Sequence, residues 1–229
     1  MGAFRVDGRA VAEAERGSVL AILGSARGDG AASAIAQDAQ SHADWLADGA
    51  RRLIPPGPIA CREGCAFCCH LRVITTIPEV LRIASDVRGL APDERAALDG
   101  RIEAHRAATA GLDAAARRLA RPACPLLVDG RCSVYAIRPM SCRGWNSLDV
   151  QACEADFLDP SRLARTTIYA PQFQINAHVQ EGMAAGLEAA GLPHDRVELV
   201  AALRIALGTP DAEARWLDGE PIFEDAAVR

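Results

Sequence analysis

All eight cysteines of this chain of 229 residues lie between residues 61 and 153. They form one dense group followed by four widely spaced single positions: Cys61, Cys65, Cys68 and Cys69, then Cys124, Cys132, Cys142 and Cys153. Thiols gathered in this way, in a chain without an export signal, are typical of proteins that bind a metal ion or an iron–sulfur cluster. The cysteine pattern therefore predicts a metal centre.

The start of the chain and its charge bear on where the protein works. The first residues lack the apolar core of a signal peptide, and the longest apolar stretch near them, Val19 to Leu23, is too short to cross a membrane. We therefore expect a cytoplasmic protein with reduced thiols and no membrane partner, in preference to a disulfide framework. The net charge of −5 argues against a nucleic-acid partner, because such proteins carry basic patches.

Length and composition predict a compact, mainly α-helical protein. Half of the residues are hydrophobic but only 4% are aromatic, and the chain is long enough for one well-filled core. We expect a single domain over residues 1–229. Its predicted parts are an N-terminal helical segment (1–58), a cysteine-cluster metal-binding core (59–156) and C-terminal helices (157–229).

Apolar residues recur every three or four positions over several stretches, which predicts amphipathic helices. These stretches are 33–53, 76–88, 93–120, 168–190 and 195–208. Thr76 and Glu79 supply a capping box for the second helix, and Gly100 and Gly111 weaken the third. Gly182 and Gly186, four residues apart, allow a neighbouring element to approach the fourth helix closely.

One short β-hairpin is expected within the cysteine-rich part. Two runs, 126–128 and 131–135, flank Asp129-Gly130, which is a strong signal for a two-residue turn. Cys124 and Cys132 would lie on either side of this turn. We expect these two strands to be the whole sheet content of the chain.

The chemistry of thiolates suits zinc or iron, which are the metals that soft ligands prefer. Gly64 supplies the flexibility for a tight turn within the dense group. The adjacent residues Cys68 and Cys69 point apart in an extended backbone, so each can serve a different site or one can be spare. Eight thiols furnish two four-thiolate centres, or one centre with extra cysteines.

Several other side chains near the cysteines are candidates for the site. Arg138 and Arg143 are candidates for binding the cofactor, because a thiolate-bound centre carries negative charge, although ordinary surface charges are the alternative. We expect Tyr135 and Trp145 to pack around the centre and keep it dry. His70 follows the dense group and is more often a surrounding residue than a nitrogen ligand.

The spacing Cys61-x3-Cys65-x2-Cys68 is also that of radical S-adenosylmethionine enzymes. Those enzymes need a barrel of alternating strands and helices, which this sequence does not show. This interpretation is therefore disfavoured.

A family resemblance rests on three motifs in order. They are Cys-x3-Cys-x2-Cys-Cys from Cys61, Cys124-Pro-Leu-Leu-x-x-Gly-x-Cys-Ser-Val-Tyr, and Arg138-Pro-x-x-Cys-Arg, which Trp145-Asn-Ser then connects to Cys153. Together, over about residues 59–156, they resemble the YkgJ-type CxxCxxCC cysteine-cluster family, described as a zinc- or iron-chelating domain. The resemblance implies zinc or a [4Fe–4S] cluster as cofactor. The first cysteine lies one residue further out than in the family pattern.

Three functions are compatible with these observations. The first is a protein that holds an iron–sulfur cluster or zinc and has a redox or enzymatic role, such as the modification of a protein partner. The second is a zinc-scaffolded protein-interaction module without catalysis. The third is a metal buffer or delivery protein. The sequence does not decide whether the protein is an enzyme.

Overall fold

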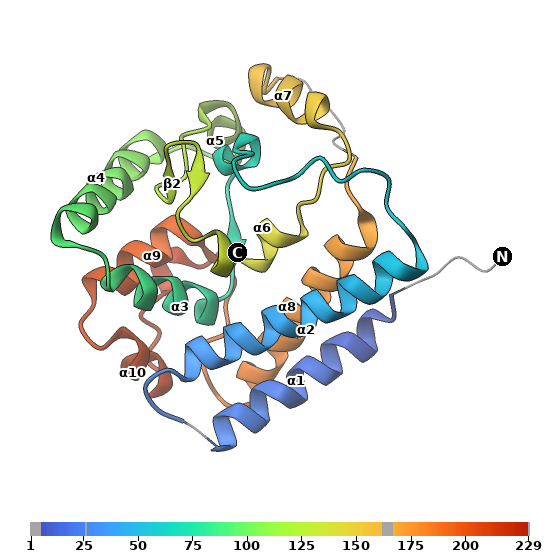
Figure 1. Ribbon diagram of the computed structural model, residues 1–229. Coiled ribbons are helices and arrows are strands. Elements are labelled where there is room, and N and C mark those ends of the chain that lie inside the picture. Colours follow the sequence, from blue (N-terminus) through green and yellow to red (C-terminus); the bar gives the residue numbers. More distant parts are fainter. Residues whose placement is uncertain (1–5, 26, 162–166, 229) are drawn as a thin grey trace.

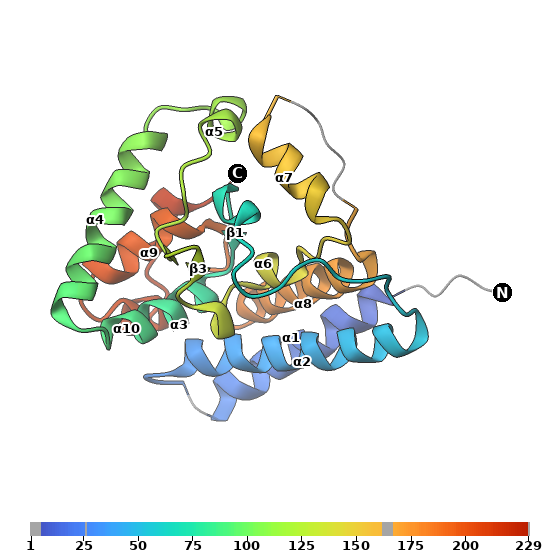
Figure 2. The same ribbon diagram turned by 45° about the horizontal axis from the view of Figure 1, so that its top comes forward.

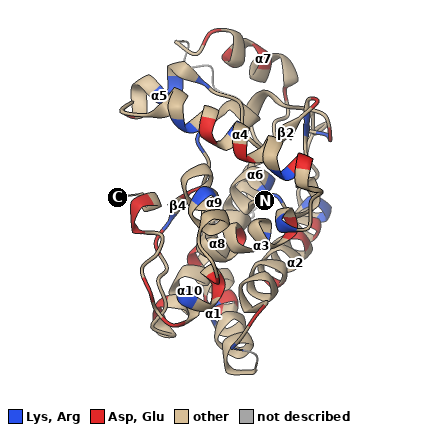
Figure 3. Cartoon of the chain, turned by 90° about the vertical axis from the view of Figure 1, so that its left-hand side faces the viewer, with Lys and Arg blue, Asp and Glu red and all other residues tan. Residues whose placement is uncertain are grey.

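The computed structural model describes residues 6–25, 27–161 and 167–228. Over these residues the chain is mainly helical with a few short strands, which confirms the predicted fold class (Figure 1). No helix in this part of the chain is long and apolar enough to cross a membrane. Acidic and basic residues are interspersed along the helices and loops drawn in Figure 3, in keeping with the small net charge.

Three long helices form the base of the molecule. They are α1 (Gly8–Ser25), α2 (Ala31–Leu53) and α8 (Ala170–Ala189), and they lie side by side in both Figure 1 and Figure 2. A stripe of alanines lets α2 pack closely on its neighbours, because small side chains bring helix axes together: Ala32, Ala36, Ala39, Ala43, Ala47 and Ala50 are all buried. The predicted helix over 33–53 is therefore confirmed.

A second layer consists of α3 (Ile77–Arg88), which contacts both α2 and α9 (Leu199–Gly208). The remaining helices are α4 (Pro92–Thr109), α5 (Ala114–Ala120), α6 (Met140–Gly144), α7 (Val150–Leu158), α10 (Ala212–Leu217) and the 3-10 turns η1 (Phe67–His70), η2 (Tyr135–Ile137) and η3 (Glu224–Ala226). The stretch predicted as one helix over 93–120 is divided between α4 and α5 at Gly111, whose φ of +70° interrupts the helix.

Two small antiparallel sheets are present among the described residues. Strands β2 (Leu127–Val128) and β3 (Arg131–Cys132) form the predicted hairpin, and both residues of its turn have positive φ, as a tight two-residue turn requires. The expectation that this hairpin is the whole sheet content was wrong. Strand β1 (Ile74–Thr75) pairs with β4 (Val197–Glu198), so the last long helix begins at Leu199 instead of residue 195.

The contact between α1 and α8 depends on two glycines, as the sequence predicted. A methyl group at Gly186 would lie 2.7 Å from the Val19 Cβ in α1, and one at Gly182 would collide with the Ala12 backbone. Only hydrogen fits at these two places, so the glycines set how closely the helices approach.

We predict that Gly182→Ala lowers the free energy of unfolding by about 1–3 kcal/mol, because the added methyl group forces the two helices apart. Gly17→Ala in α1 is the matched control, since nothing lies within 4 Å of the methyl group it adds. It should raise stability by about 0.5–1 kcal/mol. Urea unfolding followed by circular dichroism measures both. Equal stability of the two variants would contradict the close approach.

Candidate metal centre

Seven of the eight cysteines line one small cavity of about 80 Å³. They are Cys61, Cys65, Cys68, Cys69, Cys124, Cys132 and Cys142. The walls come from the loop that includes η1, from the β2–β3 hairpin and from α6, which meet in the middle of Figure 1. The fold thus brings the dense cysteine group together with Cys124, Cys132 and Cys142, which follow it much later in the sequence.

Backbone hydrogen bonds hold the two cysteine segments against each other. The Cys124 N–H donates to the Cys69 carbonyl oxygen over 2.8 Å, and the Ala60 N–H donates to the Ser147 carbonyl oxygen over 2.9 Å. Within the dense group, Gly64 has a φ of +85°, which provides the turn between Cys61 and Cys65. These bonds and this turn join the two cysteine segments at one place.

The eighth cysteine, Cys153, lies on α7 and is absent from the lining of the cavity. It is nevertheless close enough for a negative charge on its sulfur to raise the pKa of Cys61 and Cys65, after the larger effect of burial on each. Helix α7 packs on η1 through Phe157 and Phe67, whose ring centroids are 5.7 Å apart. Cys153 therefore borders one end of the cysteine group.

Burial disfavours negative charge on most of these thiols. It raises the pKa of Cys124 to about 12 and that of Cys142 well above its ordinary value, and it is also the main cause of a raised pKa for Cys132. The pKa of Cys68 is also raised, mainly by its hydrogen bond with Cys69 and secondly by burial. A cation in the cavity would reverse this preference, because a coordinating thiol is deprotonated by the metal.

One sulfur receives a hydrogen bond from the backbone. The Ser147 N–H donates to Cys61 Sγ over 3.0 Å, and this bond opposes the effect of burial on the Cys61 pKa. Such N–H···S bonds tune thiolate-bound metal centres. The contact is not evident from the sequence, because it depends on the pairing of residue 60 with Ser147.

The two candidate arginines have different surroundings. Arg138 lines the cavity, its guanidinium carbon lies 3.8 Å from the centre of the Tyr135 ring, and its charge partly offsets the effect of burial on the Cys132 pKa. Arg143 does not line the cavity. It donates to the Ala136 carbonyl oxygen and pairs with Asp44 of α2. Of the two, only Arg138 faces the cysteines.

Three other candidates from the sequence are Tyr135, Trp145 and His70. Tyr135 and Trp145 both line the cavity, as expected of residues that keep it dry. His70 lies outside it: its ring packs on Phe157 with centroids 4.7 Å apart, and Nδ1 is 3.0 Å from the Arg121 carbonyl oxygen.

The buried carboxyl group of Glu79 supports the site. From the sequence it was predicted only as part of a helix cap. Glu79 is fully buried and receives a hydrogen bond on Oε1 from the Met140 N–H, 2.6 Å away, at the start of α6. On Oε2 it accepts from Gln180 Nε2 in α8 (2.9 Å) and from groups at the start of α3, namely Thr75 Oγ1, Thr76 N and Thr76 Oγ1. Glu79 therefore holds the helix that carries Cys142.

The cysteines share a cavity without a closed coordination geometry. All eight are free thiols. Within the described residues, no group of three or more His, Cys, Asp or Glu side chains is arranged to hold a metal ion. The fit to a metal therefore rests on the donors themselves: a set of soft thiols around one shielded cavity, with a cationic side chain beside them.

The comparison with protein families agrees with this donor set. Residues 60–156 match the family model "CxxCxxCC: Putative zinc- or iron-chelating domain". The resemblance predicted from the sequence is thereby confirmed. Comparisons with curated proteins and with solved structures found no match.

We predict that Glu79→Ala lowers the free energy of unfolding by about 3 kcal/mol or more, because buried donors from three helices lose their acceptor. Glu94→Ala is the matched control. Glu94 occupies the same position in the first turn of α4, is exposed, and accepts from the Ala91 N–H alone among the bonds described. Its loss should be much smaller. Similar losses in denaturant unfolding would contradict the role given to Glu79.

Proposed function

We propose that this chain binds iron or zinc through thiolates of both cysteine segments, and that an iron–sulfur cluster is the centre it holds. The observation that carries the proposal is the single cavity lined by seven cysteines. A zinc ion is held by four ligands in a tetrahedral site, so one zinc ion would leave thiols without a role. One iron–sulfur cluster likewise takes four thiolates, so the seven cysteines exceed one centre of either kind and leave thiols for a second.

The mutual electrostatic effects of the thiols divide them into two groups that are linked through Cys68. Burial is the main cause of the raised pKa of Cys61, Cys65 and Cys142. A smaller contribution to the pKa of Cys61 and Cys65 comes from charge on Cys153, and to that of Cys142 from charge on Cys124 and Cys132. Cys68 influences members of both groups. We infer that Cys68 lies between the two groups.

The chain's own residues would shield and balance such a centre. Leu126, Val134 and Trp145 cover the cavity with apolar surface, Arg138 offers a positive charge, and the Ser147 N–H stabilises sulfur charge at Cys61. When bound, an iron–sulfur cluster supplies electron transfer, whereas a zinc ion supplies a structural cross-link. For the first case we propose a redox or enzymatic role, such as the modification of a protein partner. We place the protein in the cytoplasm, where thiols stay reduced.

Anaerobic purification followed by iron, zinc and acid-labile sulfide analysis tests the proposal. Iron together with sulfide and a brown colour supports the iron–sulfur cluster. Zinc in fixed stoichiometry without sulfide supports the zinc-scaffolded module, and zinc that is released readily while the protein stays folded supports the metal buffer. Neither metal in carefully handled, folded protein would overturn metal binding altogether.

We predict that Cys68→Ser and Cys132→Ser each abolish metal loading, because both sulfurs line the cavity and a hydroxyl is a poor substitute for a thiolate. Cys153→Ser is the matched comparison. Its sulfur borders the group without lining the cavity, so the variant should retain part of its metal.

Metal content per folded protein, measured by elemental analysis, reports the result for all three variants. Full loading of Cys68→Ser or Cys132→Ser would remove that cysteine from the metal ligands. A loss in Cys153→Ser as complete as in the other two would contradict its peripheral place.

A further inference from the structure

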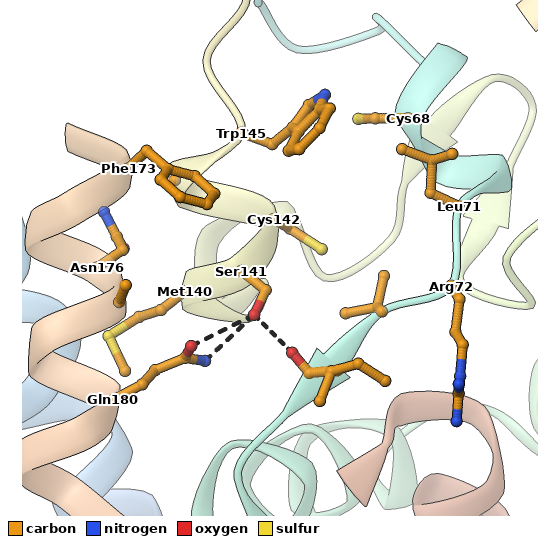
Figure 4. Close-up of a pocket in the computed structure, with 14 residues that line it drawn as sticks. Cys68, Leu71, Arg72, Met140, Ser141, Cys142, Trp145, Phe173, Asn176 and Gln180 are labelled. Carbon is orange, nitrogen blue, oxygen red and sulfur yellow. Dashed lines mark hydrogen bonds between the residues drawn. The ribbon is translucent and has the colours of Figure 1, made fainter. Parts of the chain in front are cut away.

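A second, larger cavity of about 290 Å³ lies beside the cysteine cavity (Figure 4). Its walls are mostly apolar and come from the β1 region, from α6 and from α8. The apolar lining includes Leu71, Val73, Ile74, Met140, Trp145 and Phe173. The function proposed above does not use this space.

The two cavities share a wall. Cys68, Cys142 and Trp145 line both of them, so the same sulfurs that border the proposed metal centre also border the larger space. In Figure 4 the sulfur of Cys142 and that of Cys68 lie on the side of the cavity opposite α8. Anything that fills the larger cavity therefore lies next to two candidate ligands of the metal.

The polar groups of the cavity are concentrated on the side of α6 and α8. Ser141 Oγ donates to the Ile74 carbonyl oxygen over 2.5 Å, and Gln180 Oε1 accepts from Arg196 Nη1 over 2.8 Å, so both side chains have partners. Asn176 differs. It is only 4% exposed, and its Nδ2 donates to the Gln172 carbonyl oxygen over 2.8 Å, but its Oδ1 is buried without a hydrogen-bond partner.

A buried acceptor without a partner is costly, and a ligand that donates a hydrogen bond removes that cost. Asn176 lines the cavity and the terminal torsion of an asparagine is broad, so a ligand there can reach its oxygen when that torsion turns and Nδ2 leaves the Gln172 carbonyl. Binding sites for small molecules are commonly apolar spaces with a few such polar groups. The size fits a ligand of about one ring, since this volume is at the lower end of the range for such sites.

We propose that this cavity binds a small, largely apolar molecule with one hydrogen-bond donor, and holds it against the Cys68 and Cys142 side of the metal centre. The identity of the neighbouring centre rests on the function proposed above, whereas the cavity itself does not. Phe173, 41% exposed, meets the edge of Trp145 with ring centroids 6.5 Å apart, and the two rings border the bound molecule.

The test uses benzyl alcohol and ethylbenzene as probes on the full chain as purified, because they differ only by a hydroxyl in place of a methyl group. Saturation-transfer NMR titrations give their affinities. We expect benzyl alcohol to bind. In Asn176→Ala its affinity should fall about tenfold, the effect of one lost hydrogen bond, while ethylbenzene is not weakened. An equal effect on both probes would overturn the role of the donor.

Two further variants of α8 locate the binding. Ala177 lines the cavity, so Ala177→Phe should fill it and abolish binding of both probes. Gln174 is exposed on the same helix, and Gln174→Ala should bind as the parent does. Circular dichroism confirms that each variant is folded. Absence of benzyl alcohol binding to the folded parent, or unchanged binding by folded Ala177→Phe, would overturn the proposal.

Metal analysis of the same samples separates this proposal from the previous one. Protein that contains iron or zinc but binds neither probe overturns the ligand cavity and leaves the metal centre standing. Folded protein without iron or zinc that still binds benzyl alcohol in an Asn176-dependent manner overturns the metal centre and leaves the ligand cavity standing.

Discussion

The carboxylate of Glu79 connects the helical layers to the cysteine-rich segment. It is fully buried and accepts hydrogen bonds from the starts of α3 and α6 and from the middle of α8. A buried carboxyl group needs hydrogen-bond partners around it, and here they come from segments that are distant in sequence. Removing it would release α6, and with it the position of Cys142.

The same interaction places the two cavities relative to each other. Helix α6 contributes Met140 and Ser141 to the larger cavity and Cys142 to both. Its neighbour α8 contributes Asn176 to the larger cavity and is itself fixed by the close contact of its glycines with α1. A chain of packed elements thus extends from the α1–α8 contact to the cysteine sulfurs.

Local patterns predicted much of the fold. The capping box at Thr76 and Glu79, the tight turn at Asp129-Gly130 and the glycine pair of α8 each depend on residues a few positions apart, and each is present. The pairing of β1 with β4 was missed because it joins Ile74 to Glu198 through two-residue strands, which are too short for a periodic signal.

The candidate site, too, could be predicted only in part. The cysteines as a set, Arg138, Tyr135 and Trp145 could be named from spacing and motif, and the structure gathers them at one cavity, with Cys153 at its border. Other features could not be predicted, because each depends on contacts between distant segments. They are the partner of Arg143 on α2, the Ser147 bond to Cys61 and the unpartnered oxygen of Asn176. The second cavity is likewise a property of packing and leaves no pattern in the sequence.

X-ray absorption spectroscopy of anaerobically purified protein, at the edge of whichever metal it contains, tests the central claim most directly. If thiolates of both cysteine segments hold the metal, the first coordination shell is sulfur, at about 2.3 Å in the case of zinc. A first shell dominated by nitrogen or oxygen would contradict the account, because the cavity is lined by sulfur and none of the histidines contributes to its walls.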